Sequence, residues 1–88
     1  MEFIVLNGSE MLTREQAHKY IARVMRFPSY YGGNLDALAD CLSELGSKVY
    51  ITLINFAAVR SALGEYADTM LRVFRECADE AGYHFSVN

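Results

Sequence analysis

Three short apolar runs, set far apart in the chain, most constrain what this sequence can fold into. They lie at residues 2–6, 48–54 and 83–87. The stretches that join them are far longer than a hairpin turn and carry the periodicity of helices, which suits crossover connections. The order strand, two helices, strand, two helices, strand predicts an α/β fold with a small three-stranded parallel sheet and helices packed on it.

The first strand and the helices are predicted from local signals. The continuous run FIVL suits a strand that is covered on both faces. Thr13 and Gln16 have the spacing of a capping box, and Pro28 disfavours helix at the residue before it. Asn34 is a favoured N-cap, and leucines then recur at helical spacing up to Gly46. The predicted helices span residues 14–26, 34–46, 56–63 and 65–81.

Size and charge exclude several classes of function. With 88 residues, the chain is expected to form one domain over residues 1–88. The net charge is −3 and the basic residues are scattered, which argues against direct binding of nucleic acid. No apolar run approaches the roughly 18 residues of a membrane span, and the amino-terminal residues do not resemble a secretory signal. A cytoplasmic protein without a membrane partner is therefore expected.

The sequence carries few groups that could perform catalysis. Neither His18 nor His84 has metal-ligand spacing to a cysteine or carboxylate, and each is interpreted as a surface or a hydrogen-bonded histidine. Cys41 and Cys77 form no CxxC motif and are interpreted as buried thiols. We therefore expect no enzyme activity, no cofactor and no metal site.

An acidic stretch is the strongest functional signal that the residues give by themselves. Asp36, Asp40 and Glu44 follow one another at intervals of four, opposite the leucines, and no Lys or Arg occurs between residues 27 and 47. Like charges four apart destabilise a helix by about 0.2–0.5 kcal/mol per pair. The stretch is either a solvated helix face or a surface whose cations come from a partner.

The loop before this stretch favours the second alternative. Tyr30 and Tyr31 lie between Ser29 and two glycines, where both rings are expected to be exposed. Aromatic rings supply contact area in protein interfaces, and charges beside them steer encounter and select register. Asp36 and Asp40 could also be imagined as an acid/base pair, but they would lack the burial that tunes catalytic carboxylates. The residues predict a binding site for a basic protein.

The same stretch carries a family resemblance. Residues 27–42, FPSYYGGNLDALADCL, resemble the barstar family, intracellular inhibitors of the ribonuclease barnase. A second match is VFRE at residues 73–76, and the NG turn at residues 7–8 extends the likeness over most of the chain. Residues 47–64 match only in hydrophobic pattern. The resemblance implies the same barstar-like α/β fold.

What the resemblance implies for function concerns the second helix and the loop before it. These would plug the active site of a basic, extracellular-type ribonuclease in a 1:1 complex. Asp40 would enter the pocket for the substrate phosphate, and Tyr30 would pack on the active-site histidine. Asn34 and the Gly32 backbone would bond the rim, Asp36 and Glu76 would pair with further cations, and Leu35 and Ser43 would line the contact. The expected partner-binding residues are Tyr30, Tyr31, Gly32, Asn34, Leu35, Asp36, Ala39, Asp40, Ser43, Glu44 and Glu76.

Several positions depart from the family pattern. Ala39 and Leu45 stand where the family has tryptophans, Gly33 where it has a glutamate, and the proline that begins the family's second strand is missing. These changes bear on the identity of the partner more than on the fold. Glu76 has an alternative role, an ion pair with Arg72 one helical turn earlier. The alternative to a ribonuclease inhibitor is an acidic binding module for some other basic protein.

Overall fold

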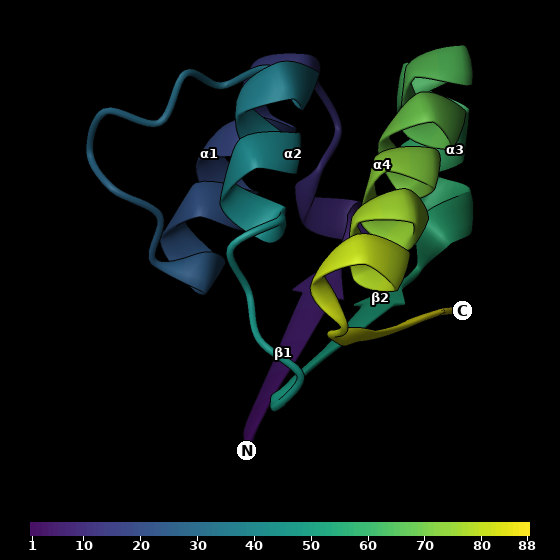
Figure 1. The fold of residues 1–88 in the computed structure, drawn as a ribbon. Coiled ribbons are helices and arrows are strands. Elements are labelled where there is room, and N and C mark those ends of the chain that lie inside the picture. The colour runs from purple at the N-terminus through teal and green to yellow at the C-terminus, as the bar shows by residue number, and fades with distance from the viewer.

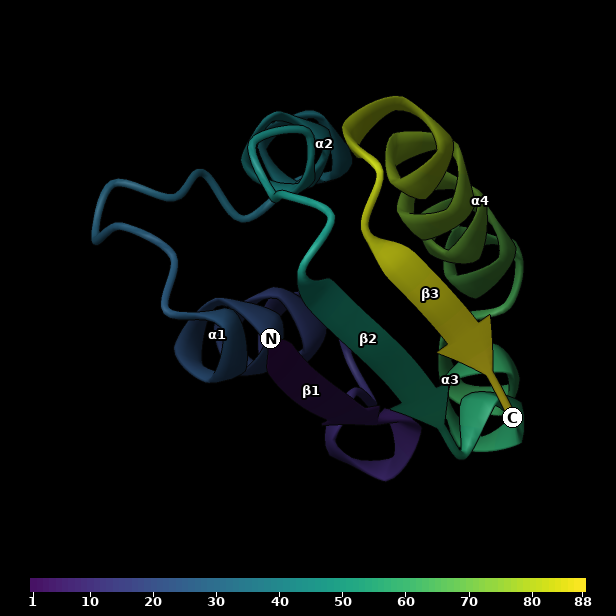
Figure 2. The same ribbon diagram turned by 60° about the horizontal axis from the view of Figure 1, so that its bottom comes forward.

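The structure, a computed structural model, describes residues 1–88. It consists of a parallel three-stranded sheet with helices packed along it (Figure 1). The central strand β2 pairs with β1 on one side and β3 on the other (Figure 2). The predicted fold class, a small parallel sheet with helices packed on it, is confirmed. In chain order the elements are β1 (Glu2–Asn7), a 3-10 turn η1 (Gly8–Glu10), α1 (Arg14–Met25), α2 (Leu35–Leu42), β2 (Val49–Ile54), α3 (Phe56–Leu63), α4 (Glu65–Ala81) and β3 (His84–Val87).

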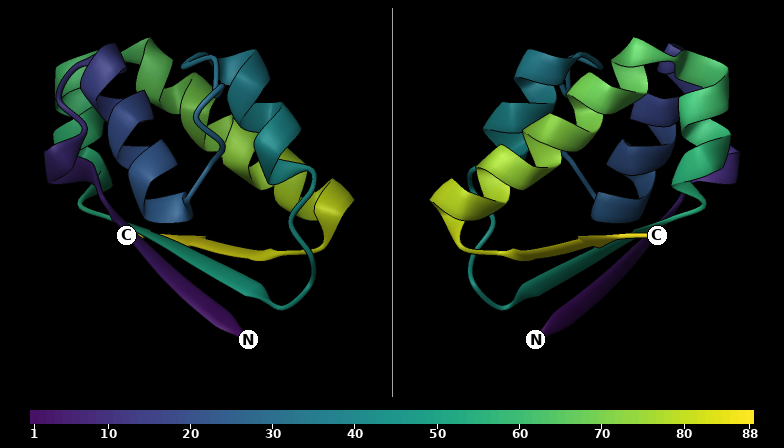
Figure 3. Two further views of the ribbon diagram at one scale, coloured as in Figure 1. Left: turned by 90° about the vertical axis from the view of Figure 1, so that its left-hand side faces the viewer. Right: turned by 90° about the vertical axis from the view of Figure 1, so that its right-hand side faces the viewer.

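The helices cover one face of the sheet and leave the other bare (Figure 3). In β1, Ile4 and Leu6 point to the covered face and are buried, whereas Phe3 is 73% and Val5 55% exposed. The expectation that the first strand is covered on both faces is therefore wrong. Stacking between neighbouring rings covers part of this exposed apolar face. The ring centroids of Phe3 and Tyr50 are 5.2 Å apart, and those of Tyr50 and His84 are 4.3 Å apart. This row follows the strand register across the sheet.

The core lies between the covered face and the inner sides of the helices. Each helix contributes apolar side chains from one stripe, as its sequence periodicity predicts. Phe74 of α4 is fully buried and stacks on Phe85 of β3 with ring centroids 5.2 Å apart. The largest fully buried side chains are Phe74, Leu6, Met11, Ile21, Leu38, Leu42, Ile51, Leu53, Met70 and Val59.

The second helix is shorter than predicted. It ends at Leu42, after which the Leu45 N–H donates to the Leu42 carbonyl at 3.1 Å in a tighter turn. The Ser43 hydroxyl donates to the Asp40 carbonyl at 2.9 Å. Because this bond competes with backbone N–H groups for the carbonyl, it favours the end of the helix. The turn still brings Leu45 to the core, so the leucine spacing continues beyond the helix. The predicted bounds of α3 and α4 are confirmed, and the others differ by one residue. For example, α1 ends before Arg26, which takes the left-handed conformation (φ 60°).

Gly8 marks the closest approach of two chain segments. It is buried at the start of η1, against the backbone that leads from β2 into α3. A Cβ on Gly8 would lie 3.2 Å from the Ile54 carbonyl oxygen and closer still to the Asn55 carbonyl oxygen. Asn55 Nδ2 also donates to Asn7 Oδ1 at 2.9 Å. The segments that follow β1 and β2 are thus packed tightly together at the carboxyl end of the sheet.

Candidate protein-binding site

The start of α2 is fixed by the loop that precedes it. Asn34 caps the helix, with its Oδ1 accepting from the Ala37 N–H at 2.8 Å. Gly33 takes a positive φ of 67°, which a residue with a side chain rarely adopts, and so turns the chain into the helix. Gly32 passes close to the first turn, where an added Cβ would lie 3.3 Å from the Ala37 Cβ. The loop and the helix therefore present their outer groups as one surface.

The acidic residues of this surface have no partner within the molecule. Asp36 and Asp40 are exposed on α2, and Glu44 is exposed in the turn after it. The predicted placement of Glu44 on the same helix face is wrong, because the helix ends at Leu42. The ion pairs of the structure lie elsewhere, at Glu15–Lys19 and Arg60–Asp68. These three carboxylates are free to meet cations of another molecule.

The two tyrosines of the loop have different surroundings. Tyr30 is 86% exposed. Tyr31 is half-buried, packs against Phe27 with ring centroids 5.0 Å apart and places its hydroxyl 2.7 Å from His18 Nδ1. The expectation of two exposed rings is therefore wrong for Tyr31, because its hydroxyl finds a buried partner. Only Tyr30 offers a whole ring to a partner.

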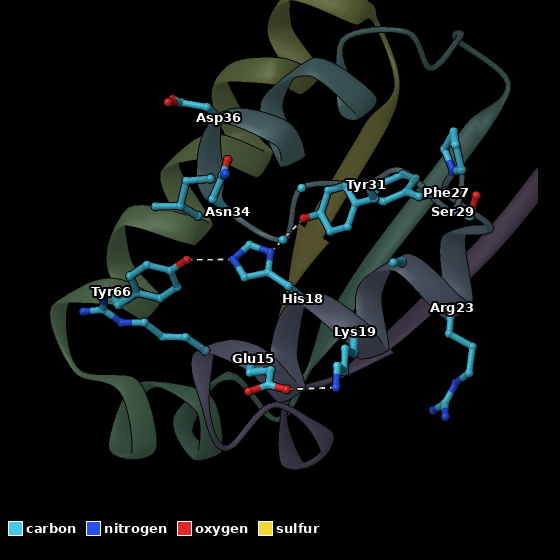
Figure 4. A pocket seen from close by; sticks show the side chains of 16 residues that line it. Glu15, His18, Lys19, Arg23, Phe27, Ser29, Tyr31, Asn34, Asp36 and Tyr66 are labelled. Atoms are coloured by element: carbon cyan, nitrogen blue, oxygen red, sulfur yellow. Dashed lines mark hydrogen bonds and ion pairs between the residues drawn. The ribbon is translucent and has the colours of Figure 1, made fainter.

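Two hollows flank the loop, and eight of the eleven predicted residues line one or the other. The larger, of about 950 Å³, lies beside α1 and is drawn in Figure 4. Its lining includes Tyr31, Gly32, Asn34, Leu35 and Asp36. The smaller, of about 330 Å³, is lined in part by Tyr30, Asp40 and Glu44, together with Arg26, which the sequence reasoning did not include.

The remaining predicted residues line neither hollow. Ala39 is half-buried where α2 meets α4, and its carbonyl accepts a weak bond from the Cys77 thiol at 3.8 Å. Ser43 is exposed after α2. Glu76 is exposed on α4 beside Cys77. The ion pair with Arg72 that was considered as its alternative role is not formed. Glu76 lies on the helix that packs against α2, next to Cys77, which contacts Ala39 of α2.

A buried histidine connects the loop to two helices. His18 of α1 is 3% exposed, and its Nε2 lies 2.6 Å from the Tyr66 hydroxyl of α4, opposite the bond to Tyr31 (Figure 4). The Arg14 guanidinium lies 4.1 Å above the Tyr66 ring. Sequence reasoning allowed for a hydrogen-bonded histidine but missed Tyr66. A signal was available in the sequence, because His18 is a polar residue that lies with Ala17 and Ile21 on the buried stripe of α1. A buried polar side chain requires hydrogen-bond partners.

The buried histidine predicts a pH-dependent stability. Burial lowers the pKa of His18 below its usual 6.5, because the charged form loses hydration. At low pH the unfolded chain then binds more protons than the folded one. The stabilisation by neutral His18 is therefore complete above about pH 6.5 and is lost as the pH falls below about 6.5 through the pKa of the folded state. Urea denaturation between pH 8 and pH 5 should show a smaller loss for His18→Gln than for the wild type. His84→Gln, on the exposed face, is the control. If the free energy of unfolding changed equally with pH in His18→Gln and the wild type, the prediction would be contradicted.

The other titratable groups do not form a reactive centre. Burial raises the pKa of the Cys41 and Cys77 thiols, so both stay protonated and weakly nucleophilic near neutral pH. Cys77 is buried as expected, whereas Cys41 is only half-buried. No group of three His, Cys, Asp or Glu side chains is arranged to hold a metal ion. None of the helices combines the length and apolar character that crossing a membrane requires.

Fold and site together define a small α/β protein whose loop and second helix expose carboxylates without internal ion pairs beside one exposed aromatic ring. The model of the family described as "Barstar (barnase inhibitor)" matches residues 1–88, and the chain belongs to this family. It is also 35% identical over 88 residues to the "Putative ribonuclease inhibitor YrdF" of Bacillus subtilis (strain 168), covering 99% of this chain and 97% of that protein. Members of the family are ribonuclease inhibitors and not enzymes, and family membership assigns this chain the same general role with a ribonuclease as its partner.

Proposed function

We propose that this protein inhibits a secreted, guanyl-specific ribonuclease of the barnase type by forming a 1:1 complex in the cytoplasm. The loop before α2 and the exposed side of α2 cover the enzyme's active site, and Asp40 takes the place of a substrate phosphate. The observation that carries the proposal is the exposure of Asp36 and Asp40 without internal cations, on a helix fixed beside the exposed Tyr30.

Electrostatics support this arrangement. A ribonuclease active site must hold phosphate and is therefore cationic, so carboxylates without internal partners match it in sign. Opposite charges on two surfaces accelerate encounter and fix the register of docking. The exposed ring of Tyr30 adds apolar contact area at the edge of the acidic surface. Each of these contributions uses groups that the fold itself leaves unpaired.

The departures at Ala39 and Gly33 bear on which ribonuclease is bound. Ala39 is half-buried against the core and offers only a small side chain where the family pattern has a tryptophan. Gly33 is needed for its positive φ and carries no acidic group. The surface is therefore flatter and less acidic at these two positions, which favours a cognate enzyme whose rim differs from that of barnase.

The test is a titration of the protein into barnase-type and other small secreted microbial ribonucleases while RNA cleavage is followed. We expect cleavage by at least one of these enzymes to fall linearly to zero at one inhibitor per enzyme. A panel without inhibition, combined with binding to basic proteins that are not ribonucleases, would contradict the proposal and favour an acidic module with another partner.

A further inference from the structure

We propose that Tyr66 is a positioning residue of the binding surface, which acts through His18 to hold the loop of residues 27–34 in its docking conformation. The inference rests on the proposed function, because it concerns how the same loop is made ready for a ribonuclease. Tyr66 itself lies on α4, outside the set of residues that the family resemblance implies.

The geometry is a chain of hydrogen bonds across three parts of the fold. The hydroxyl of Tyr66 lies 2.6 Å from one nitrogen of His18, and the hydroxyl of Tyr31 lies 2.7 Å from the other (Figure 4). The bond to Tyr31 is the only side-chain hydrogen bond between the loop and α1. Phe27 and Tyr31 also hold the loop by packing against the core, but its side-chain hydrogen bonding to α1 depends on the orientation of a single imidazole ring.

The protons in this chain can be assigned from its surroundings. A neutral imidazole has one N–H donor and one acceptor nitrogen, so one tyrosine donates to it and the other accepts from it. The Arg14 cation above the Tyr66 ring makes the Tyr66 hydroxyl the better donor. The Tyr66 hydroxyl then donates to Nε2 of His18, and the Nδ1–H of His18 donates to the Tyr31 oxygen.

Burial of the ring favours its neutral form, and charged groups from two helices lie around the hollow beside it. From α1, Arg14, Glu15 and Lys19 line the same hollow, and from α2 so does Asp36. Glu15 and Lys19 pair with each other at 2.8 Å, whereas Arg14 has no ion pair and lies over the Tyr66 ring. With the ring neutral, Tyr66 determines which nitrogen carries the proton and hence whether Tyr31 receives a bond.

Loss of the Tyr66 hydroxyl should therefore loosen a loop to which that hydroxyl makes no direct hydrogen bond. Without a donor at Nε2, the imidazole can change tautomer or turn, and the bond to Tyr31 weakens. A loop that is not held in advance must be ordered at the moment of binding, which lowers affinity. One net hydrogen bond corresponds to about a three- to tenfold weaker inhibition of the ribonuclease.

The experiment compares Tyr66→Phe with a matched control, Tyr20→Phe. This control also removes one hydroxyl that makes one hydrogen bond. The Tyr20 hydroxyl accepts from the Asn7 N–H at 2.9 Å, at the sheet rather than at the loop. For Tyr66→Phe we expect a changed nitrogen-15 spectrum of His18, faster hydrogen exchange of the amides of residues 30–33, and three- to tenfold weaker inhibition. For Tyr20→Phe we expect none of these changes. Unchanged exchange and an unchanged His18 spectrum in Tyr66→Phe would overturn the inference.

A double-mutant cycle tests whether the two tyrosines communicate through the histidine. Tyr31→Phe and Tyr66→Phe, singly and together, are compared by urea denaturation of the free protein. Non-additive effects on the free energy of unfolding are expected, although the two hydroxyls bond to opposite sides of the ring. Additive effects would overturn the inference. Because the cycle, the spectra and the exchange rates need no ribonuclease, failure of the inference is distinguishable from failure of the proposed function.

Discussion

Replacing Asp40 with alanine is expected to weaken the ribonuclease complex by about two to three orders of magnitude, mainly through faster dissociation. The carboxylate is exposed and has no internal ion pair, so its removal takes nothing from the fold. In the proposed complex it is enclosed among the cations of the phosphate pocket. Its loss leaves those cations desolvated and unpaired, which is the costly way to break a buried pair.

The matched control is Asp68→Ala. Asp68 lies on α4 and pairs with Arg60 of α3 at 3.0 Å, on a part of the molecule away from the acidic surface. Its removal should cost at most about 1 kcal/mol in the free energy of unfolding and leave the ribonuclease complex intact. Dissociation rates measured for both variants decide the matter. Equal effects of the two substitutions would show that Asp40 does not occupy the phosphate pocket.

The second large effect is expected at Gly8, where alanine should lower the free energy of unfolding by about 3 kcal/mol. The added methyl group would meet the backbone carbonyls of Ile54 and Asn55, which belong to the connection between β2 and α3. Backbone cannot turn aside as a flexible side chain can, so the two connections must separate. Urea denaturation measures the loss directly.

Gly46→Ala is the control for Gly8→Ala. No atom lies within 4 Å of a Cβ placed at Gly46, and its φ is not in the left-handed region. Alanine there should leave stability nearly unchanged or raise it slightly by restricting the unfolded chain. Similar losses at both glycines would show that the close approach at Gly8 does not limit the fold.

The element order and the core were predictable because each depends on local periodicity. The apolar stripes of α1 and α4 and the three strand runs required no knowledge of distant residues. The covered and bare faces of the sheet could not be separated in the same way. Phe3 and Val5 look as buried in the sequence as Ile4 and Leu6, because the run FIVL does not reveal which face the helices take.

The candidate site was predictable where its residues are exposed and lie close together in sequence. Tyr30, Asp36 and Asp40 are exposed as the sequence indicated. Two features depended on long-range packing and were not predicted. Tyr31 is drawn inward by His18, and Tyr66 reaches the same ring from a helix 48 residues further along the chain than His18.

The central position of β2 has a consequence for how quickly the molecule folds. Glu2 pairs with Val49 and Tyr50 with His84, so every contact between strands closes a long loop of chain. Closing such loops costs entropy before any pairing compensates for it, and a topology rich in distant contacts folds slowly. No hairpin can act as a starting point here. We therefore expect the helices, which form from neighbouring residues, to assemble early and to carry the strands together, with β2 the strand on which the other two converge.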